Sequence, residues 1–206
     1  MNKEIIDLGR DLHHFVNLSN LNKNSVIVDA GANVGNFIKA IREHLHCPIF
    51  AIECSKQNLE FINDCHFEDV VIIEKALVGE HREVTLVEYS GELKADGTKR
   101  YNQWSNIYDY HGHLPGASQR KYSVETITIQ DILSSVGEID YLKVDIEGSE
   151  YEVIESLSVE DAKKIKQLSM ETHYPEQNES LKSNLKALGF ALEEKLNNEL
   201  YCWRVL

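Results

Sequence analysis

The chain has 206 residues, of which 42% are hydrophobic and 27% charged; these values exclude a disordered chain or a fibrous repeat and fit a single domain over residues 1–206. Its formal net charge of −13 disfavours nucleic acid or an anionic membrane surface as a partner, because clustered cations recognise both. The acidity by itself indicates solubility.

The first third of the chain alternates between helical and strand patterns. Apolar residues recur at near-helical spacing and predict a helix over residues 1–20, within an N-terminal helical segment at 1–24. Continuous apolar runs, typical of buried parallel strands, follow at 26–28, 48–54 and 69–76. Helical patterns lie between them at 37–45 and 57–65.

The middle of the chain breaks this alternation. Residues 82–90 alternate apolar and polar side chains, as a half-exposed strand does, and 122–133 read as a strand leading into a short helix. The stretch between them is rich in Tyr and Trp, which stack on sugar or ring substrates or, alternatively, pack on the sheet edge. We predict a β-excursion with a loop insertion at about 82–129, whose loop 91–121 faces a substrate, with Ser105 and Asn106 as candidate contacts.

The strand–helix alternation returns at residue 139. Strand patterns at 139–148 and 165–173 are followed by helical patterns at 149–157 and 179–189. Residues 190–196 and 199–206 predict an antiparallel hairpin across Asn197-Asn198. This order predicts an α/β fold with a three-layer, Rossmann-like sheet, mostly parallel, that ends in an antiparallel hairpin.

The cysteines and the N-terminus indicate where the protein works. Cys47, Cys54, Cys65 and Cys202 form no CxxC pair, so we expect free thiols and a reducing compartment. The N-terminus is charged throughout, and no apolar run approaches the length of a membrane span. We therefore expect a cytoplasmic protein, for which an oligomer is possible.

A glycine turn, Asp29-Ala30-Gly31-Ala32-Asn33-Val34-Gly35, joins the first predicted strand to a helix. Gly31 permits a tight turn and close approach of a ligand, and Gly35 permits close packing of the helix. The turn lacks the G-x-G-x-x-G dinucleotide pattern, because Asn33 replaces its middle glycine. Asp29 would repel a pyrophosphate but suits a cationic ligand. The alternative is a turn that merely caps a strand.

Glu53 ends the second predicted strand, 22 residues after Gly31. A carboxylate there can accept hydrogen bonds from both hydroxyls of a ribose. Alone, Glu53 would be a surface carboxylate. Together with the glycine turn it indicates a nucleoside that has a positive centre and no pyrophosphate. S-adenosylmethionine (SAM) fits this description.

Three segments carry a resemblance to a known family. VDAGANVGNF (28–37), AIECSKQN (51–58) and, most specifically, YLKVDIEGSEYEVIESL (141–157) resemble motifs of the FkbM-type family of SAM-dependent methyltransferases. The resemblance extends over about residues 24–206. It implies a Rossmann-like methyltransferase fold, SAM as methyl donor, and hydroxyl acceptors on sugars or natural-product scaffolds. The protein is then expected to be an O-methyltransferase acting on a small molecule or glycan.

The expected cofactor-binding residues lie at or beside the predicted strand ends. They are Asp29, Gly31, Asn33, Gly35, Glu53, Cys54, Ala76, Asp145 and Glu147. Asp145 ends a buried strand, where an unpaired carboxylate would be unfavourable, and could hold the donor's ammonium or orient the acceptor. Glu150, in contrast, reads as a simple helix-start carboxylate.

The expected catalytic residues are His173, Asp145 and Lys143. An unperturbed imidazole titrates near neutral pH, so His173 is the candidate base; its alternative is a hydrogen-bonded rim histidine. His111 and His113 are rivals in the loop, whereas His13-His14 reads as a solvated pair. No metal is assigned, although Asp145, Glu147, Glu171 and His173 could hold Mg²⁺.

Two other functions are compatible with the sequence. One is an NAD-dependent oxidoreductase, which the missing middle glycine and Asp29 oppose. The other is a non-catalytic nucleoside-binding module that kept the fold, because a fold does not fix a function. NAD binding without SAM binding would indicate the first, and SAM binding without turnover would indicate the second.

Overall fold

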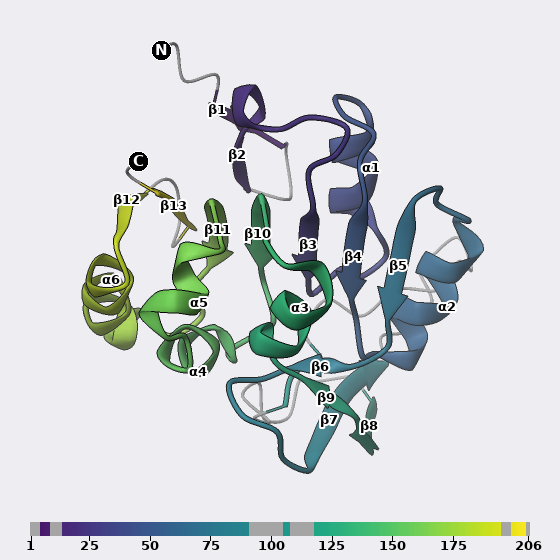
Figure 1. Cartoon of the computed structure of the whole chain (residues 1–206). Coiled ribbons are helices and arrows are strands. Elements are labelled where there is room, and N and C mark those ends of the chain that lie inside the picture. Colours follow the sequence, from purple (N-terminus) through teal and green to yellow (C-terminus); the bar gives the residue numbers. More distant parts are fainter. Residues whose placement is uncertain (1–4, 9–13, 91–104, 108–117, 195–198, 205–206) are drawn as a thin grey trace.

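Residues 5–8, 14–90, 105–107, 118–194 and 199–204 are described by the computed structural model. Within them, the main sheet has the strand order β12-β13-β11-β10-β3-β4-β5 (Figure 1). Strands β3, β4, β5, β10 and β11 run parallel, and β13 pairs antiparallel with both β11 and β12. The strands are β3 (Ile27–Ala30), β4 (Ile49–Ile52), β5 (Val70–Ile73), β10 (Tyr141–Val144), β11 (Gln167–Glu171), β12 (Phe190–Glu194) and β13 (Glu199–Arg204). The predicted fold class and C-terminal hairpin are confirmed.

Helices cover both faces of this sheet. They are α1 (Asn36–Arg42), α2 (Lys56–Asp64), α3 (Ile129–Val136), α4 (Glu150–Glu155), α5 (Val159–Lys163) and α6 (Asn178–Ala187). Helices α1 and α2 pack on the face that carries Ile27 and Tyr141, and α3 to α6 pack on the face that carries Val28 and Leu142. Successive strand residues point to opposite faces, so a continuous apolar run serves both layers. The short helix α5 was not predicted.

Local sequence fixes where the helices begin. The side chain of Ser55 accepts a hydrogen bond from the backbone N–H of Asn58 and caps α2. Thr128 and Asp131 form a reciprocal capping box at the start of α3. Such caps satisfy backbone donors that the first helical turn leaves without partners.

The predicted β-excursion is confirmed. Strand β7 (Val84–Ser90) pairs antiparallel with β8 (Ser118–Val124), and β6 (Ala76–Leu77) pairs parallel with β9 (Thr126–Ile127). Both pairs lie beyond the carboxyl ends of β3 and β4 (Figure 1). From the predicted loop, Asn106 forms an isolated bridge with Val87. His111 and His113 lie outside the described residues.

The predicted N-terminal helix is wrong. Strands β1 (Ile5–Asp7) and β2 (Phe15–Asn17) form an antiparallel pair instead, followed by a 3₁₀ turn, η1 (Leu18–Asn20). Side chains of β11 hold β2: the backbone N–H of Phe15 donates to Ser169 Oγ at 3.1 Å, and that of Asn17 to Gln167 Oε1 at 2.9 Å. These distant partners outweigh a weak local periodicity. No described helix combines the length and apolar composition that a membrane crossing requires.

Candidate active site

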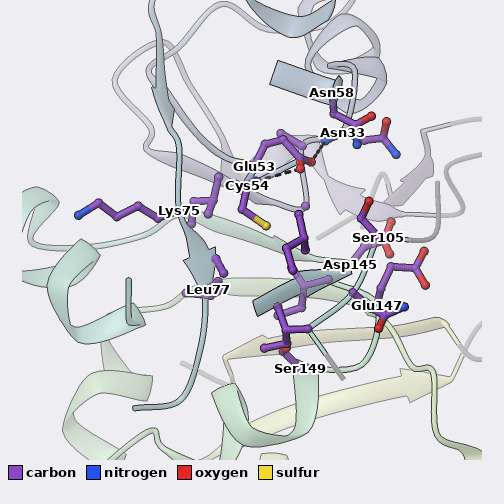
Figure 2. Close-up of a pocket in the computed structure, with 18 of the residues that line it drawn as sticks. Asn33, Glu53, Cys54, Asn58, Lys75, Leu77, Ser105, Asp145, Glu147 and Ser149 are labelled. Carbon is purple, nitrogen blue, oxygen red and sulfur yellow. Dashed lines mark hydrogen bonds between the residues drawn. The ribbon is translucent and has the colours of Figure 1, made fainter. Parts of the chain in front are cut away.

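A pocket of about 410 Å³ opens where β3, β4 and β10 end. The excursion supplies its far wall through Leu77, Leu86 and residues 105–107. Figure 2 shows Glu53 and Cys54 in one part of the pocket and Asp145, Glu147 and Ser149 in another. Of the residues predicted to bind a cofactor or act in catalysis, those that line the pocket are Gly31, Asn33, Glu53, Cys54, Ala76, Lys143, Asp145 and Glu147. The predicted strand ends therefore converge on one cavity.

The glycine turn packs against the end of β10. A Cβ on Gly31 would lie 1.7 Å from the carbonyl oxygen of Asp145, and the φ of Gly31 is +79°. Only glycine tolerates both the contact and the conformation. Gly35 is different: a Cβ there would meet the ring of Phe67 at 2.6 Å, and Gly35 does not line the pocket. Gly35 is the N-cap residue of α1, and its left-handed conformation serves the start of that helix and not ligand binding.

Asp29 and Lys143 form a buried ion pair beneath this turn. Their side chains are 0% and 3% exposed, and Lys143 Nζ lies 3.2 Å from Asp29 Oδ1. Lys143 Nζ also donates to the carbonyl of Gly31 at 2.7 Å and lies 3.6 Å from Asp145 Oδ2. Asp29 does not line the pocket. It faces Lys143 instead of a ligand, so its place in the fold is that of a counter-ion.

Glu53 stands at the end of β4 with its carboxylate held by backbone donors. Its Oε1 accepts from the N–H groups of Cys54 and Ser55, at 2.9 and 2.7 Å, and its Oε2 accepts from that of Asn33 at 2.8 Å. Burial raises the pKa of Glu53 to about 7, and the three N–H groups only partly oppose that rise. Burial also raises the pKa of the Cys54 thiol, which disfavours a nucleophilic role for it.

A group of carboxylates surrounds His173. The Nε2 of His173 lies 3.4 Å from Glu147 Oε2 and 4.0 Å from both Asp145 Oδ1 and Glu171 Oε1. On the other side of the ring, Nδ1 donates to Glu150 Oε1 at 3.0 Å. The carboxyl ends of the neighbouring strands β10 and β11 bring Asp145, Glu147, Glu171 and His173 together, as their predicted positions at strand ends implied.

Glu150 is more than the helix-start residue that the sequence suggested. Its side chain is fully buried and accepts hydrogen bonds from the backbone N–H groups of Ile146 and Gly148. These bonds close the turn in which Glu147 takes a left-handed conformation, with φ at +55°. Glu150 therefore orients both the turn and the imidazole of His173.

The electrostatics oppose His173 as a free base. Burial alone would lower its pKa, but the hydrogen bond to Glu150 and the charges of Glu147 and Asp145 raise the pKa of His173 to about 10. The unliganded imidazole therefore holds a proton at neutral pH, contrary to the sequence expectation.

Burial raises the pKa of two neighbouring carboxyl groups, that of Glu147 to about 8 and that of Glu171 to about 7. Burial would raise the pKa of Asp145 as well, but Lys143, His14 and His173 hold it well below its usual range.

His14 joins the site from the N-terminal strand pair, which the sequence did not indicate. Its side chain is 1% exposed, so the expectation of a solvated histidine is wrong. Its Nε2 lies 3.7 Å from Asp145 Oδ2, and its Nδ1 lies 3.4 Å from Glu199 Oε2.

The sequence analysis also missed the pocket residues Asn58 and Lys75. Asn58 lies in the first turn of α2, shortly after Glu53, and Lys75 follows the end of β5, so strand-end reasoning extended by a few residues would have found both.

Comparisons with known proteins agree with this architecture. A family model described as the methyltransferase FkbM domain matches residues 29–194. No curated protein matches the chain. Among solved structures, a proposed methyltransferase from Streptococcus mutans in complex with SAH is similar, with a TM-score of 0.50 and 12% identity over 91% of this chain and 96% of that chain.

Two further solved structures are similar at low identity. A Streptococcus thermophilus rRNA methylase has a TM-score of 0.49 and 13% identity, covering 96% of this chain and 98% of that chain. A precorrin-6y C5,15-methyltransferase from Geobacter metallireducens has a TM-score of 0.49 and 15% identity, covering 91% and 85%. The family match and the likeness to the S. mutans structure together show a Rossmann-like methyltransferase fold.

Proposed function

Because this chain belongs to the FkbM family of methyltransferases, we propose that it uses S-adenosylmethionine to methylate a hydroxyl of a small molecule or glycan. The observation that carries the proposal is the pocket itself. It combines a carboxylate at the end of β4, a glycine turn at the end of β3 and an acidic group at the ends of β10 and β11.

The pocket fits the proposed donor. S-adenosylmethionine, when bound, supplies a methyl group activated by a positively charged sulfur. Glu53 lines the pocket and is the proposed acceptor for the ribose hydroxyls, together with the pocket residues Asn33, Cys54 and Ala76. Gly31, without a Cβ, lets the turn pack against the backbone of Asp145 and so brings the two sides of the pocket together. Asp145, whose pKa is held well below its usual range, gives this end of the pocket the negative charge that a sulfonium and an ammonium require, and Glu147 lies beside it.

The acidic group around His173 is the proposed acceptor site. Asp145, Glu147 and Glu171 of this group line the same pocket as residues 105–107 of the excursion. We assign the catalytic roles there to Asp145 and His173, which together orient the acceptor hydroxyl. Lys143 takes a positioning role instead, because it is 3% exposed and holds Asp29, Asp145 and the carbonyl of Gly31. Correct alignment of oxygen, methyl and sulfur supplies much of the acceleration in such a displacement.

The chain's charge supports a small acceptor over nucleic acid. Lys and Arg number 21 against 34 Asp and Glu, and the proposed acceptor site is lined by carboxylates. A phosphate backbone would meet repulsion there. Hydroxylated sugars and ring compounds carry no such penalty.

Calorimetric titration of the purified protein with SAM, SAH and NAD tests the donor. We expect saturable binding of SAM and SAH, none of NAD, and weaker SAH binding by Glu53→Gln. Glu43→Gln, at the exposed residue that caps the C-terminal end of α1, serves as a charge-matched control with unchanged affinity. Binding of NAD alone would overturn the proposal.

Mass spectrometry of reactions with a panel of sugars, hydroxylated ring compounds and RNA tests the acceptor. The expected product is an O-methyl ether formed together with SAH. Methylation of RNA, or of a carbon or nitrogen atom, would show that the acceptor class is wrong while leaving the donor assignment intact.

A further inference from the structure

We propose that Asp145, Glu171 and His173 bind one divalent metal ion at the wall of the pocket. One ligand atom from each residue can be chosen so that all lie within 4.8 Å of one another. Two ligands on opposite sides of a small divalent ion, each at about 2.1 Å, are about 4.2 Å apart. The three side chains therefore need only small movements to coordinate a common ion.

The orientation of His173 is that of a metal ligand. Its Nδ1 donates to Glu150, whose carboxylate is 0% exposed and anchored by the backbone N–H groups of Ile146 and Gly148. When a metal ion replaces the proton on Nε2, the atom that faces Asp145 and Glu171, this bond keeps Nδ1 as the donor and leaves Nε2 to bind the ion. A histidine held through its other nitrogen by a buried carboxylate is the usual outer-sphere arrangement around a bound metal.

The carboxylates around Nε2 of His173 also favour a cation at this point. Nε2 of His173 has Glu147 at 3.4 Å in addition to Asp145 and Glu171 at 4.0 Å. In the unliganded protein the protonated imidazole meets these carboxylates, and a metal ion bound to Nε2 would take the place of its proton. An ion at the centre would also relieve the repulsion among the carboxylates.

The ligand set favours a first-row ion such as Mn²⁺. Carboxylate oxygens suit Mg²⁺ and Mn²⁺, whereas an imidazole nitrogen favours transition metals over Mg²⁺ or Ca²⁺. The absence of cysteine from the group disfavours a soft metal such as Cu(I). Asp145 and Glu171 line the pocket, so open coordination positions would face the acceptor. An acceptor oxygen bound there would be acidified by the ion, a role that rests on the proposed function.

Binding of Mn²⁺ itself tests the site, without any assay of methyl transfer. Full-length protein treated with a chelator is titrated with Mn²⁺ while EPR reports the free ion, both with and without SAH. We expect one saturable site per chain. Glu171→Gln and His173→Gln should each weaken it by about ten-fold or more. Glu160→Gln removes the same charge from a surface carboxylate that is 77% exposed, and should leave the affinity unchanged.

Pulsed EPR of the loaded protein adds a direct readout. Coordination by His173 predicts a nitrogen modulation in the wild type that His173→Gln abolishes, which a merely structural histidine would not produce. Weak binding that Glu171→Gln does not alter, or no saturable binding with or without SAH, overturns the proposal. Mn²⁺ binding in a protein that binds neither SAM nor SAH would instead refute the proposed function and leave the metal site standing.

Discussion

The Nε2 of His14 lies 3.7 Å from Oδ2 of Asp145, although His14 precedes the segment that the family model matches. Nδ1 of the same ring reaches Glu199 on β13 at 3.4 Å. One buried imidazole therefore links the N-terminal strand pair, the end of β10 and the C-terminal hairpin. The residue that we assign to catalysis is thus supported from outside the matched region.

Replacing His14 should weaken both the fold and the site. His14→Ala leaves the carboxylates of Asp145 and Glu199 without this partner, and we expect a loss of about 1–3 kcal/mol in the free energy of unfolding. SAH affinity should fall as well, because Asp145 loses one of the groups that hold it. Urea denaturation and calorimetry measure the two effects. His44→Ala, at an exposed histidine, should change neither, and an unaltered stability in His14→Ala would contradict this assignment.

The sheet was predictable because its signals are local. The apolar runs of β3, β4 and β10 serve two layers at once, and the glycine turn and Glu53 stand at strand ends that must share one edge. Parallel pairing of β10 with β11 likewise brings Asp145 and His173 together. These features follow from the order of elements alone.

The remainder depends on partners that are distant in sequence. Strand β2 is extended because Ser169 and Gln167 accept its backbone hydrogen bonds, and no pattern within residues 1–20 reports this. The burial of His14 has the same origin. The protonation of His173 could not be predicted either, because it depends on how closely Glu147, Glu150 and Asp145 approach the ring.

Gly31 should tolerate no side chain. Gly31→Ala would place a methyl group 1.7 Å from the carbonyl oxygen of Asp145, so the β3 turn and the end of β10 would have to separate. Gly137→Ala is a matched control: its φ is +82°, but a Cβ there meets nothing within 4 Å. The control isolates backbone strain, about 1–3 kcal/mol. In thermal denaturation Gly31→Ala should be clearly the less stable of the two, and equal losses would contradict a steric role.

Replacing Lys143 should lower the free energy of unfolding, because its main role is structural. Lys143→Met leaves Asp29, whose side chain is 0% exposed, without its counter-ion, and breaking a buried pair in this way costs about 3–5 kcal/mol. The double variant Asp29→Asn/Lys143→Met removes both charges and should regain part of that loss. Urea denaturation of the single and double variants measures the difference. A Lys143→Met protein as stable as the wild type would restore a directly catalytic role for the lysine.

Cofactor affinity should depend on pH through Glu53. Its pKa is raised to about 7, so the carboxyl group is largely protonated at pH 6 and largely ionised at pH 8. Ribose hydroxyls donate more strongly to a carboxylate than to a neutral acid, so the ionised form is the better binder. The dissociation constant for SAH should therefore fall as the pH rises through about 7, with release of a proton on binding below that value.

Glu53→Gln separates this effect from other groups that titrate in the pocket. The variant cannot ionise at this position, so calorimetry should find weaker binding at pH 8 and a shallower dependence between pH 6 and pH 8 than in the wild type. Repeating the titration in buffers of different ionisation enthalpy counts the protons released. A Glu53→Gln protein with the same pH dependence as the wild type would show that the ribose hydroxyls bind elsewhere, and that Glu53 serves only to hold the N–H groups of Asn33, Cys54 and Ser55.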